Sequence, residues 1–267
     1  MTTMTLTTAT RPAFTGCYTA LITPFRNGEL DIPALRTLVE RQILGGVSGL
    51  VPCGTTGETP ALSTREWETV VSTVVETTQG RVPVIAGTGS NGTASTIERT
   101  QRAQELGADA ALVVTPYYNK PTQEGLFQHF AAIANATDIP LVLYNVPGRT
   151  SVNMMPETVL RLTTVPGIAA IKEASGSLDQ ASQILGEAPE GFAVLSGDDS
   201  LTLPIMGVGG VGVVGRIEAL DRVGAVGIAA CGAPDPVPVI SGMEPRPCGE
   251  RGRLDRKDAG HRHDQLR

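Results

Sequence analysis

Short apolar runs recur along the chain and predict eight β-strands. Each run is almost continuously apolar rather than alternating, which is typical of parallel strands that are covered on both faces. The predicted strands are Cys17–Ile22, Gly49–Cys53, Val82–Gly87, Ala110–Thr115, Pro140–Asn145, Ile168–Lys172, Phe192–Ser196 and Val211–Val214.

Segments with helical periodicity lie between these runs. The clearest begins after Ser63, where Ser63 and Glu66 form a capping-box pattern and apolar residues recur every three or four positions from Trp67 to Val75. Three more predicted helices contain Leu35–Ile43, Ile97–Leu106 and Leu126–Ile133, and weaker helical segments follow Met155, Ser177 and Asp199.

Strand and helix therefore alternate through seven units and end on an eighth strand. This alternation fits either an open doubly wound sheet or a closed barrel. The count of eight favours the α/β fold known as the (β/α)8 or TIM barrel, whose usual size is about 250 residues. A chain of 267 residues has room for one such barrel.

The two ends of the chain depart from the pattern. Residues 1–13 begin with a threonine-rich stretch, and we expect them to be disordered. The barrel is expected over residues 14–231, with an irregular last helix that Gly224 and Gly227 weaken. Residues 232–267 are rich in proline and arginine without periodicity, which predicts an irregular tail.

Composition narrows the range of partners and compartments. The formal net charge of -6 argues against nucleic acid and anionic membrane surfaces. No apolar run approaches the roughly 18 residues that a membrane span requires. The four cysteines lie far apart, which suits free thiols in a reducing compartment. Since the first residues also lack a signal-peptide pattern, we expect a cytoplasmic protein.

Lys172, at the end of the sixth predicted strand, is the first candidate for chemistry. A buried ammonium ion is costly, and burial lowers the pKa of a lysine toward the free amine, which is a nucleophile. The alternative is a side chain that extends from the strand end into water. The stretch by itself leaves both possibilities open.

Further polar side chains follow other predicted strands. Residues 54–58, Gly-Thr-Thr-Gly-Glu, form a turn whose hydroxyls and backbone N–H groups suit a small carboxylate. Tyr118 follows the fourth strand and Tyr144 lies at the end of the fifth, and a phenol both donates and accepts protons. Arg149, on a Pro-Gly turn, offers a planar fork to a carboxylate.

Each of these residues also has an ordinary structural role available, as part of a strand-to-helix turn, as tyrosine packing or as a surface ion pair. Their shared position favours a site, because the carboxyl ends of parallel barrel strands meet at one face. A buried lysine, hydroxyl relays and carboxylate binders together suit Schiff-base chemistry on a keto acid. The candidates are Thr55, Thr56, Tyr118, Tyr144, Arg149 and Lys172.

Five motifs between about Phe14 and Val214 resemble those of the dihydrodipicolinate synthase family, in their order and at their spacing. The wider superfamily of pyruvate-dependent lyases and aldolases, including N-acetylneuraminate lyase, shares the lysine and the first motif, whereas the paired tyrosines and the Arg149 loop point to the synthase. The motifs are Gly-Thr-Thr-Gly-Glu at 54–58, Pro-Tyr-Tyr-Asn-Lys-Pro at 116–121, Tyr-Asn-Val-Pro-Gly-Arg-Thr at 144–150, Ile-Lys-Glu-Ala at 171–174 and Ser-Gly-Asp-Asp at 196–199.

The resemblance implies a condensation of pyruvate with L-aspartate 4-semialdehyde to 4-hydroxy-tetrahydrodipicolinate, on the route to diaminopimelate and lysine. Lys172 would form an imine with pyruvate. Thr56 and the Thr55 backbone would bind the pyruvate carboxylate, and Arg149 the semialdehyde carboxylate. Val214 would line the site with its carbonyl. No metal or organic cofactor is implied, since the lysine itself is the electron sink.

The resemblance also implies a proton relay that crosses between subunits. Tyr144 would move protons at the imine, and Thr55 would link it to Tyr118 of a neighbouring subunit, so a homo-oligomer, in the family a tetramer, is expected. The chain departs from the family after Val214. We therefore expect the eighth helix and the C-terminal helical region to be altered or missing.

Two other functions fit parts of the sequence. Residues 87–92 match the Gly-x-Gly-x-x-Gly pattern of dinucleotide-binding oxidoreductases, although they follow the third strand rather than the first. The altered C-terminal region suits a truncated barrel that binds keto acids without turning them over.

Overall fold

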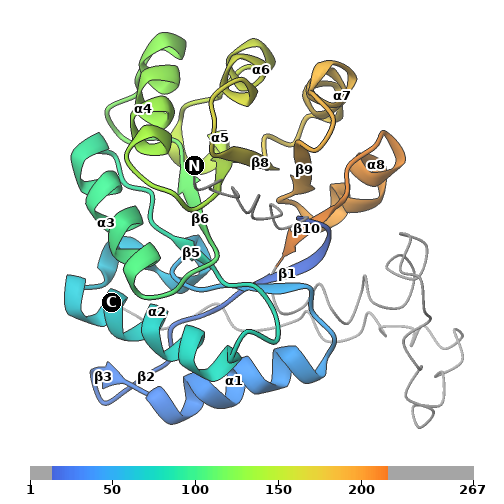
Figure 1. The fold of residues 1–267 in the computed structure, drawn as a ribbon. Coiled ribbons are helices and arrows are strands. Elements are labelled where there is room, and N and C mark those ends of the chain that lie inside the picture. The colour runs from blue at the N-terminus through green and yellow to red at the C-terminus, as the bar shows by residue number, and fades with distance from the viewer. Residues whose placement is uncertain (1–13, 216–267) are drawn as a thin grey trace, which may run out of the picture. The chain divides into compact units, whose positions relative to one another are not determined.

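A ring of eight parallel strands lies at the centre of the computed structural model, which describes residues 14–215, and helices surround it (Figure 1). The predictions for residues 1–13, 216–231 and 232–267 lie outside the described residues. The barrel strands are β1 (Gly16–Ala20), β4 (Gly49–Val51), β5 (Ile85–Gly87), β6 (Ala110–Val114), β7 (Leu141–Asn145), β8 (Ile168–Glu173), β9 (Ala193–Ser196) and β10 (Gly212–Gly215).

Hydrogen bonding closes the ring. Each strand pairs in parallel with its neighbours in the order β4-β1-β10-β9-β8-β7-β6-β5. A parallel bridge between Leu50 and Val84 joins the two ends of that order, and the backbone N–H of Leu50 donates to the carbonyl of Pro83 at 3.0 Å. The sheet is therefore a barrel rather than an open doubly wound sheet, as the strand count predicted.

Helices follow the strands at the predicted places, with ends shifted by a few residues. The helices are α1 (Ile32–Leu44), α2 (Thr64–Thr78), α3 (Thr93–Glu105), α4 (Gln123–Asn135), α5 (Pro147–Thr150), α6 (Pro156–Thr163), α7 (Leu178–Glu187) and α8 (Thr202–Gly207), with 3-10 turns η1 (Thr55–Gly57), η2 (Thr59–Ala61) and η3 (Asp199–Leu201). The sequence did not predict the hairpin of β2 (Phe25–Arg26) and β3 (Glu29–Leu30), whose two-residue strands are too short for periodicity.

The predicted capping box of α2 is confirmed. The backbone N–H of Glu66 donates to Ser63 Oγ at 3.3 Å, and the N–H of Ser63 donates to Glu66 Oε2 at 2.8 Å. The helix then lays its buried face on the barrel, where Trp67 Nε1 donates to the carbonyl of Gly87 at 2.9 Å. The capping box sets the first residue of α2, and the buried hydrogen bond from Trp67 to Gly87 sets the orientation of the helix on the barrel.

The apolar core forms three clusters. One lies inside the barrel and includes Tyr18, Val51, Leu112 and Leu195. A second packs α1, α2 and α3 against β4 and β5, and a third packs α4, α6 and α7 against β6 to β9. Both faces of the strands are thus covered, which accounts for their continuous apolar sequences.

One irregularity in the barrel sets the register around β8. Leu141 of β7 pairs with Ile168, but the next residue, Val142, pairs with Ala170, so Ala169 is an extra residue in β8. Such a bulge moves every later residue of its strand by one position. Ala169 and Ala170 consequently both lie in the cluster inside the barrel.

Close backbone packing accounts for the first two glycines, Gly87 and Gly89, of the Gly-x-Gly-x-x-Gly pattern. A β-carbon on Gly87 would lie 1.9 Å from the carbonyl oxygen of Cys53, and one on Gly89 would lie 2.5 Å from the backbone nitrogen of Val114. Only glycine permits such approaches. The pattern therefore has a structural cause at these positions that involves no nucleotide.

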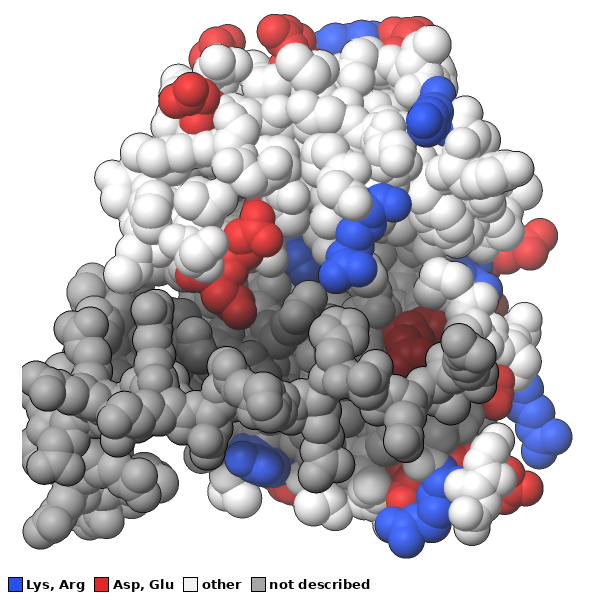
Figure 2. Space-filling model, turned by 180° about the vertical axis from the view of Figure 1, so that it is seen from behind, with Lys and Arg blue, Asp and Glu red and all other residues white. Residues whose placement is uncertain are grey.

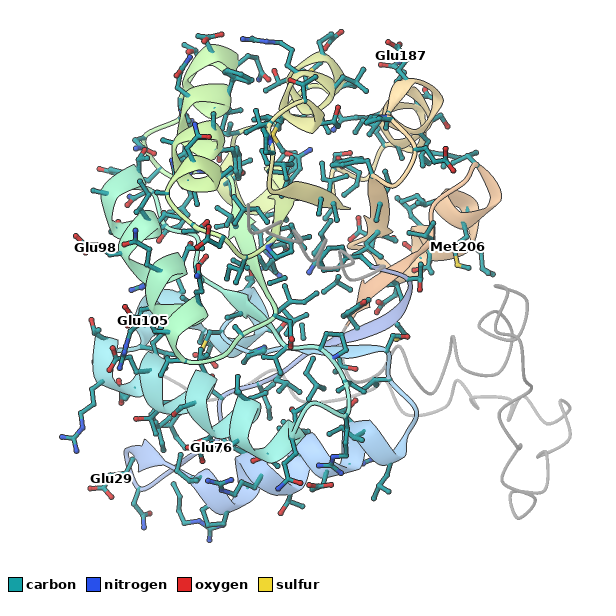
Figure 3. The ribbon with its side chains drawn as sticks, in the orientation of Figure 1. Glu29, Glu76, Glu98, Glu105, Glu187 and Met206 are labelled. Carbon is teal, nitrogen blue, oxygen red and sulfur yellow. The ribbon has the colours of Figure 1, made fainter. Side chains whose placement is uncertain are left out.

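Most charged side chains of the helices are exposed on the outer surface. Glu98 on α3 and Glu187 on α7 lie at the outer edge of the structure, away from the barrel strands (Figure 3). Both signs of charge are scattered over a mostly uncharged surface on the face shown in Figure 2. No helix within residues 14–215 is both long and apolar enough to cross a membrane.

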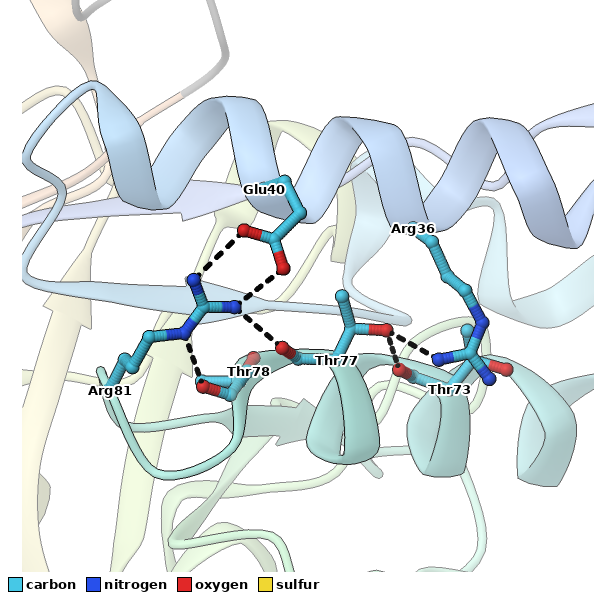
Figure 4. A network of polar contacts seen from close by, with 6 residues as sticks. All are labelled: Arg36, Glu40, Thr73, Thr77, Thr78 and Arg81. Atoms are coloured by element: carbon cyan, nitrogen blue, oxygen red, sulfur yellow. Dashed lines mark hydrogen bonds and ion pairs between the residues drawn. The ribbon is translucent and has the colours of Figure 1, made fainter.

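A polar network joins the exposed sides of α1 and α2 (Figure 4). Arg81 donates to both carboxylate oxygens of Glu40, at 2.8 and 2.6 Å, and to the carbonyls of Thr77 and Thr78, at 2.7 and 3.0 Å. Hydrogen bonds from Arg81 lower the pKa of the Glu40 carboxyl. Because the pair faces solvent, it orients the end of α2 more than it stabilises the fold.

His129 of α4 is a buried ionisable group in the outer layer. It is 5% exposed, a hydrogen bond of 2.9 Å joins its Nδ1 to Thr93 Oγ1, and its ring contacts Phe130 edge-on. Within residues 14–215 its Nε2 has no hydrogen-bond partner. Burial lowers the pKa of His129 to about 4.

Acidification should therefore destabilise the fold through His129. The folded chain keeps the ring neutral down to its pKa of about 4, whereas the unfolded chain binds a proton near the ordinary histidine pKa of 6.5, so stability is lost as the pH falls between these values. The expected loss is roughly 3 kcal/mol at the acid end of this window. Urea unfolding of the wild type and of His129→Gln from pH 7 to pH 4 measures it. Identical pH slopes in the two proteins would contradict the prediction.

Candidate active site

A cavity of about 370 Å³ lies at the carboxyl ends of the barrel strands. Six of the seven residues predicted for the site line it, although they come from four different strand-end segments. These residues are Thr55, Thr56, Tyr144, Arg149, Lys172 and Val214. The closed barrel thus brings together side chains that lie up to 159 positions apart in the chain, from Thr55 to Val214 (214 − 55).

Lys172 points into this cavity from the end of β8 and is 7% exposed. The ladder between β7 and β8 places it opposite Tyr144, and its Nζ lies 4.3 Å from the centre of the Tyr144 ring. The amine is therefore buried against an aromatic face rather than extended into water. The sequence left open a buried amine or a side chain that extends into water, and the structure shows the buried amine.

Gly197, just beyond β9, confines Lys172 from another side. A β-carbon at Gly197 would lie 3.1 Å from Lys172 Cε and 2.5 Å from the β-carbon of Ala174. The N–H of Gly197 also donates to the carbonyl of Glu173 at 2.7 Å, so this close approach is held by a backbone hydrogen bond. The position of the lysine stem thus depends on the absence of a side chain at Gly197.

The turn after β4 presents backbone N–H groups to the cavity. Residues Thr55–Gly57 form the 3-10 turn η1, which the N–H of Gly57 closes by donating to the carbonyl of Gly54 at 3.1 Å. Within residues 14–215 no hydrogen bond occupies the backbone N–H groups of Thr55 and Thr56. A pair of N–H groups of this kind suits a small anion, and the carboxylate site expected from the sequence stays a prediction.

Arg149 lies on the exposed rim of the same cavity, on the single-turn helix α5. Thr150 anchors this turn from the buried side, since its hydroxyl donates to the carbonyls of Val146 and Val152 at 3.2 and 3.0 Å. Arg149 makes no salt bridge within the described part of the chain. Its guanidinium is thus held near the cavity without a protein carboxylate on it.

Tyr118 is the one predicted site residue that does not line the cavity of its own chain. Its side chain is 88% exposed, and its backbone has the left-handed φ of 72°. Its neighbour Tyr117 instead lines a second cavity of about 250 Å³. The two cavities share Thr55, Tyr144 and Arg149 among their walls.

The second cavity contains a thiol that is not a nucleophile at neutral pH. Cys53 is 2% exposed, and desolvation raises the pKa of its thiol to about 12. A thiol reacts through its thiolate, so Cys53 acts as packing. Among residues 14–215 no group of three or more His, Cys, Asp or Glu side chains is placed to hold a metal ion.

Sequence reasoning did not assign a role to Asp198 and Asp199, which also line the 370 Å³ cavity. Both follow β9 directly, so the signal was available: polar residues at the end of a barrel strand. They place negative charge in the same cavity as Lys172 and Arg149. Glu173, which is buried behind the lysine, was missed for a different reason, because nothing in the sequence shows what surrounds it.

Comparisons with known proteins place this geometry in a family. The profile of the Dihydrodipicolinate synthetase family matches residues 13–228. A curated relative from Thermomicrobium roseum, a 4-hydroxy-tetrahydrodipicolinate synthase, is 60% identical over 199 residues, which are 74% of this chain and 66% of the relative. The chain thus matches about two thirds of the length of that relative.

Solved structures agree with the sequence matches. The 4-hydroxy-tetrahydrodipicolinate synthase of Methylacidiphilum fumariolicum SolV superposes with a TM-score of 0.76 at 48% identity, over 78% of this chain and 69% of that one. A protein characterised as the first monomeric dihydrodipicolinate synthase variant gives a TM-score of 0.77 at 43% identity, over 79% and 71%.

A side chain at Gly197 should displace Lys172 and slow its reactions. In Gly197→Ala, the added carbon would lie 2.5 Å from the β-carbon of Ala174 and 3.1 Å from Lys172 Cε, so Ala174 must shift and the lysine stem must give way slightly. A displacement smaller than about 1 Å is expected to slow the reaction of the amine by up to roughly 10-fold. The rate of reductive alkylation of Lys172 by a small aldehyde, followed by peptide mass mapping, measures the effect. The exposed Lys120 is the internal reference. The control is Gly186→Ala on α7, where nothing lies within 4 Å; equal rates at Lys172 in both variants would contradict the prediction.

Proposed function

Because the chain belongs to the Dihydrodipicolinate synthetase family, we propose that it condenses pyruvate with L-aspartate 4-semialdehyde to give 4-hydroxy-tetrahydrodipicolinate. One observation carries the proposal. A buried amine, that of Lys172, shares a cavity with the Arg149 guanidinium and with Thr55 and Thr56, whose backbone N–H groups are not used in hydrogen bonds within residues 14–215. Amine chemistry on one substrate and recognition of two carboxylates are what this reaction requires.

Pyruvate is the first substrate in this mechanism. The N–H groups of Thr55 and Thr56 bind its carboxylate, which directs the ketone carbon toward Lys172. Burial favours the uncharged amine, and Nζ attacks the ketone to form a carbinolamine. Loss of water, with a proton supplied to the leaving hydroxyl, gives the protonated imine. Tyr144, whose ring lies beside Nζ, is the group placed to pass that proton.

The imine then activates the methyl group of pyruvate. Its positive nitrogen draws electrons from the neighbouring carbon, so a methyl proton leaves and an enamine forms. The enamine carbon attacks the aldehyde carbon of the semialdehyde, and the aldehyde oxygen takes up a proton. The amino group of the semialdehyde then closes the ring on the imine carbon and releases Lys172. The imine nitrogen accepts the electron pair of the broken C–H bond, so the reaction needs no organic cofactor as an electron sink.

Arg149 binds the carboxylate of the semialdehyde. Its guanidinium lies on the rim, whereas Lys172 lies deep in the cavity, so the second substrate is held with its aldehyde toward the enamine. The planar fork of arginine makes two parallel hydrogen bonds to a carboxylate, which fixes orientation as well as position. Recognition of the two carboxylates is thus divided between the backbone turn and Arg149.

Tyr118 completes the proton path from a second subunit. Its exposed ring projects from its own chain, which supports a role in another copy rather than in its own cavity. Thr55, on the rim of the cavity, is the residue that links Tyr118 of the partner to Tyr144. The active form in this proposal is a homo-oligomer.

Pyruvate with borohydride tests the reaction directly. The full chain should gain one reduced pyruvate adduct at Lys172, and Lys172→Ala should gain none. Arg149→Ala should form the adduct as the wild type does, but lose roughly 10- to 100-fold in kcat/KM for the semialdehyde, because charged hydrogen bonds to substrate are removed. A wild-type chain that forms the adduct without turnover would indicate a non-catalytic keto-acid binder. Equal loss of the adduct in both variants would indicate a folding defect.

Mixed oligomers test whether Tyr118 acts across subunits. Tyr118→Phe should lower turnover by about 10²-fold, as expected for a lost proton relay, and Lys172→Ala should be inactive. In hybrids of the two, the Lys172→Ala subunit can supply Tyr118 to the intact lysine of its partner. Activity of the co-refolded mixture above that of either parent is therefore expected. A mixture no more active than its parents, at an oligomeric state confirmed by sedimentation, would contradict the prediction.

A further inference from the structure

Two residues that follow the site residues in the chain point to the opposite side of the barrel wall. The ladder pairs Tyr144 with Lys172 and, one step later, Asn145 with Glu173. Side chains alternate along a strand, so the first pair faces the cavity and the second faces the helices. Asn145 is fully buried and Glu173 is 2% exposed.

Glu173 is a buried carboxylate that accepts only N–H donors. The backbone N–H of Ser175 donates to its Oε1 at 2.6 Å, and Gln180 Nε2 and Asn145 Nδ2 donate to its Oε2 at 3.1 and 3.2 Å. The hydrogen-bond donors to it within residues 14–215 are thus one backbone amide and two side-chain amides. A buried carboxyl group is less favourable for stability than an apolar side chain of similar size, which points to another reason for its presence.

Three amide side chains extend these bonds into one cluster. Asn145 Nδ2 donates to Asn153 Oδ1 at 2.8 Å, and Asn153 Nδ2 donates to Gln180 Oε1 at 2.9 Å. The N–H of Met154 donates to Asn145 Oδ1 at 3.0 Å. We call Asn145, Asn153, Glu173 and Gln180 the Glu173 cluster. It joins the end of β7, the end of β8, the segment after α5 and the first turn of α7.

The cluster holds the barrel wall at the point where strand pairing stops. Asn145 and Glu173 are the last paired residues of β7 and β8. The ends of strands open locally when nothing beyond them is fixed. Here the pair next to the strand ends is Tyr144 and Lys172, so local opening would move the amine and the phenol apart. The backbone carbonyl of Glu173 also accepts a hydrogen bond from the N–H of Gly197. Glu173 therefore also helps to hold Gly197, which packs against the stem of Lys172.

We propose that Glu173, through this cluster, is a positioning residue that aligns Lys172 with Tyr144 for imine formation, an inference that rests on the function proposed above. Glu173 does not touch the substrate in this account. It sets the relative position of the two strand ends from behind, so that the long side chain of Lys172 reaches a carbonyl bound in the cavity. The competing explanation is that the cluster only stabilises the fold.

Glu173→Gln separates the two explanations. Glutamine has the same shape, but its NH₂ group would face the donors of Asn145 and Gln180, which disrupts the cluster without a change in volume. The matched control is Thr100→Val, which removes a buried hydroxyl that donates to Thr88 Oγ1 at 2.9 Å and to the Thr96 carbonyl at 2.7 Å, on α3 and outside both cavities. Both variants lose buried hydrogen bonds, but only one loses them behind Lys172.

The measurement is the single-turnover rate of pyruvate adduct formation at Lys172, trapped with borohydride, together with urea unfolding of the same proteins. Glu173→Gln is expected to slow the adduct rate by about 10²-fold at saturating pyruvate, with little change in the half-saturating pyruvate concentration. Thr100→Val is expected to lower the unfolding free energy while the adduct rate stays as in the wild type. This split between rate and affinity is not expected of a purely structural role.

Each other outcome counts against the inference. An adduct rate in Glu173→Gln equal to that of Thr100→Val overturns it and leaves the proposed function intact. A wild-type chain that forms no adduct overturns the proposed function, and the inference with it. If Glu173→Gln does not fold, Asn153→Ala, which trims the cluster from a partly exposed position, decides the matter: a slowed adduct rate supports the inference, and an unchanged rate overturns it.

Discussion

The register between β7 and β8 is the constraint on which the site depends. Because Ala169 is an extra residue in β8, Tyr144 lies opposite Lys172 rather than opposite Ile171. Side chains alternate along a strand, so a slip of one residue would turn the lysine toward the helices and bring Glu173 to the cavity. The bulge needs two consecutive small residues inside the barrel, and Ala169 and Ala170 provide them.

The two basic side chains of the cavity, Lys172 and Arg149, lie in contrasting surroundings. Lys172 is 7% exposed, and its Nζ lies 4.3 Å from the centre of the Tyr144 ring. Arg149 lies on the exposed rim of the same cavity. One cavity thus holds a buried amine at its floor and an exposed guanidinium at its rim.

Two buried polar side chains outside the cavity, His129 and Glu173, are unfavourable for the stability of the fold. The ring of His129 is kept neutral by burial alone, and Glu173 is held by N–H donors. Each is less favourable for stability than an apolar residue of the same size. The exposed ion pairs between α1 and α2 do not compensate, because charges that face solvent contribute little. The three apolar clusters are therefore the main source of stability.

The sequence by itself determined the eight strands, the helices between them and the capping box at Ser63, because apolar periodicity and capping are local properties. It also indicated most of the cavity, since residues at the ends of parallel strands must converge on one face. Tertiary structure alone decided the rest. The bulge at Ala169, the tight contact of Gly197 with Lys172 and the donors around Glu173 all depend on segments that are distant in the chain. The exposure of Tyr118 belongs with them, because no local pattern shows which way a loop side chain will point.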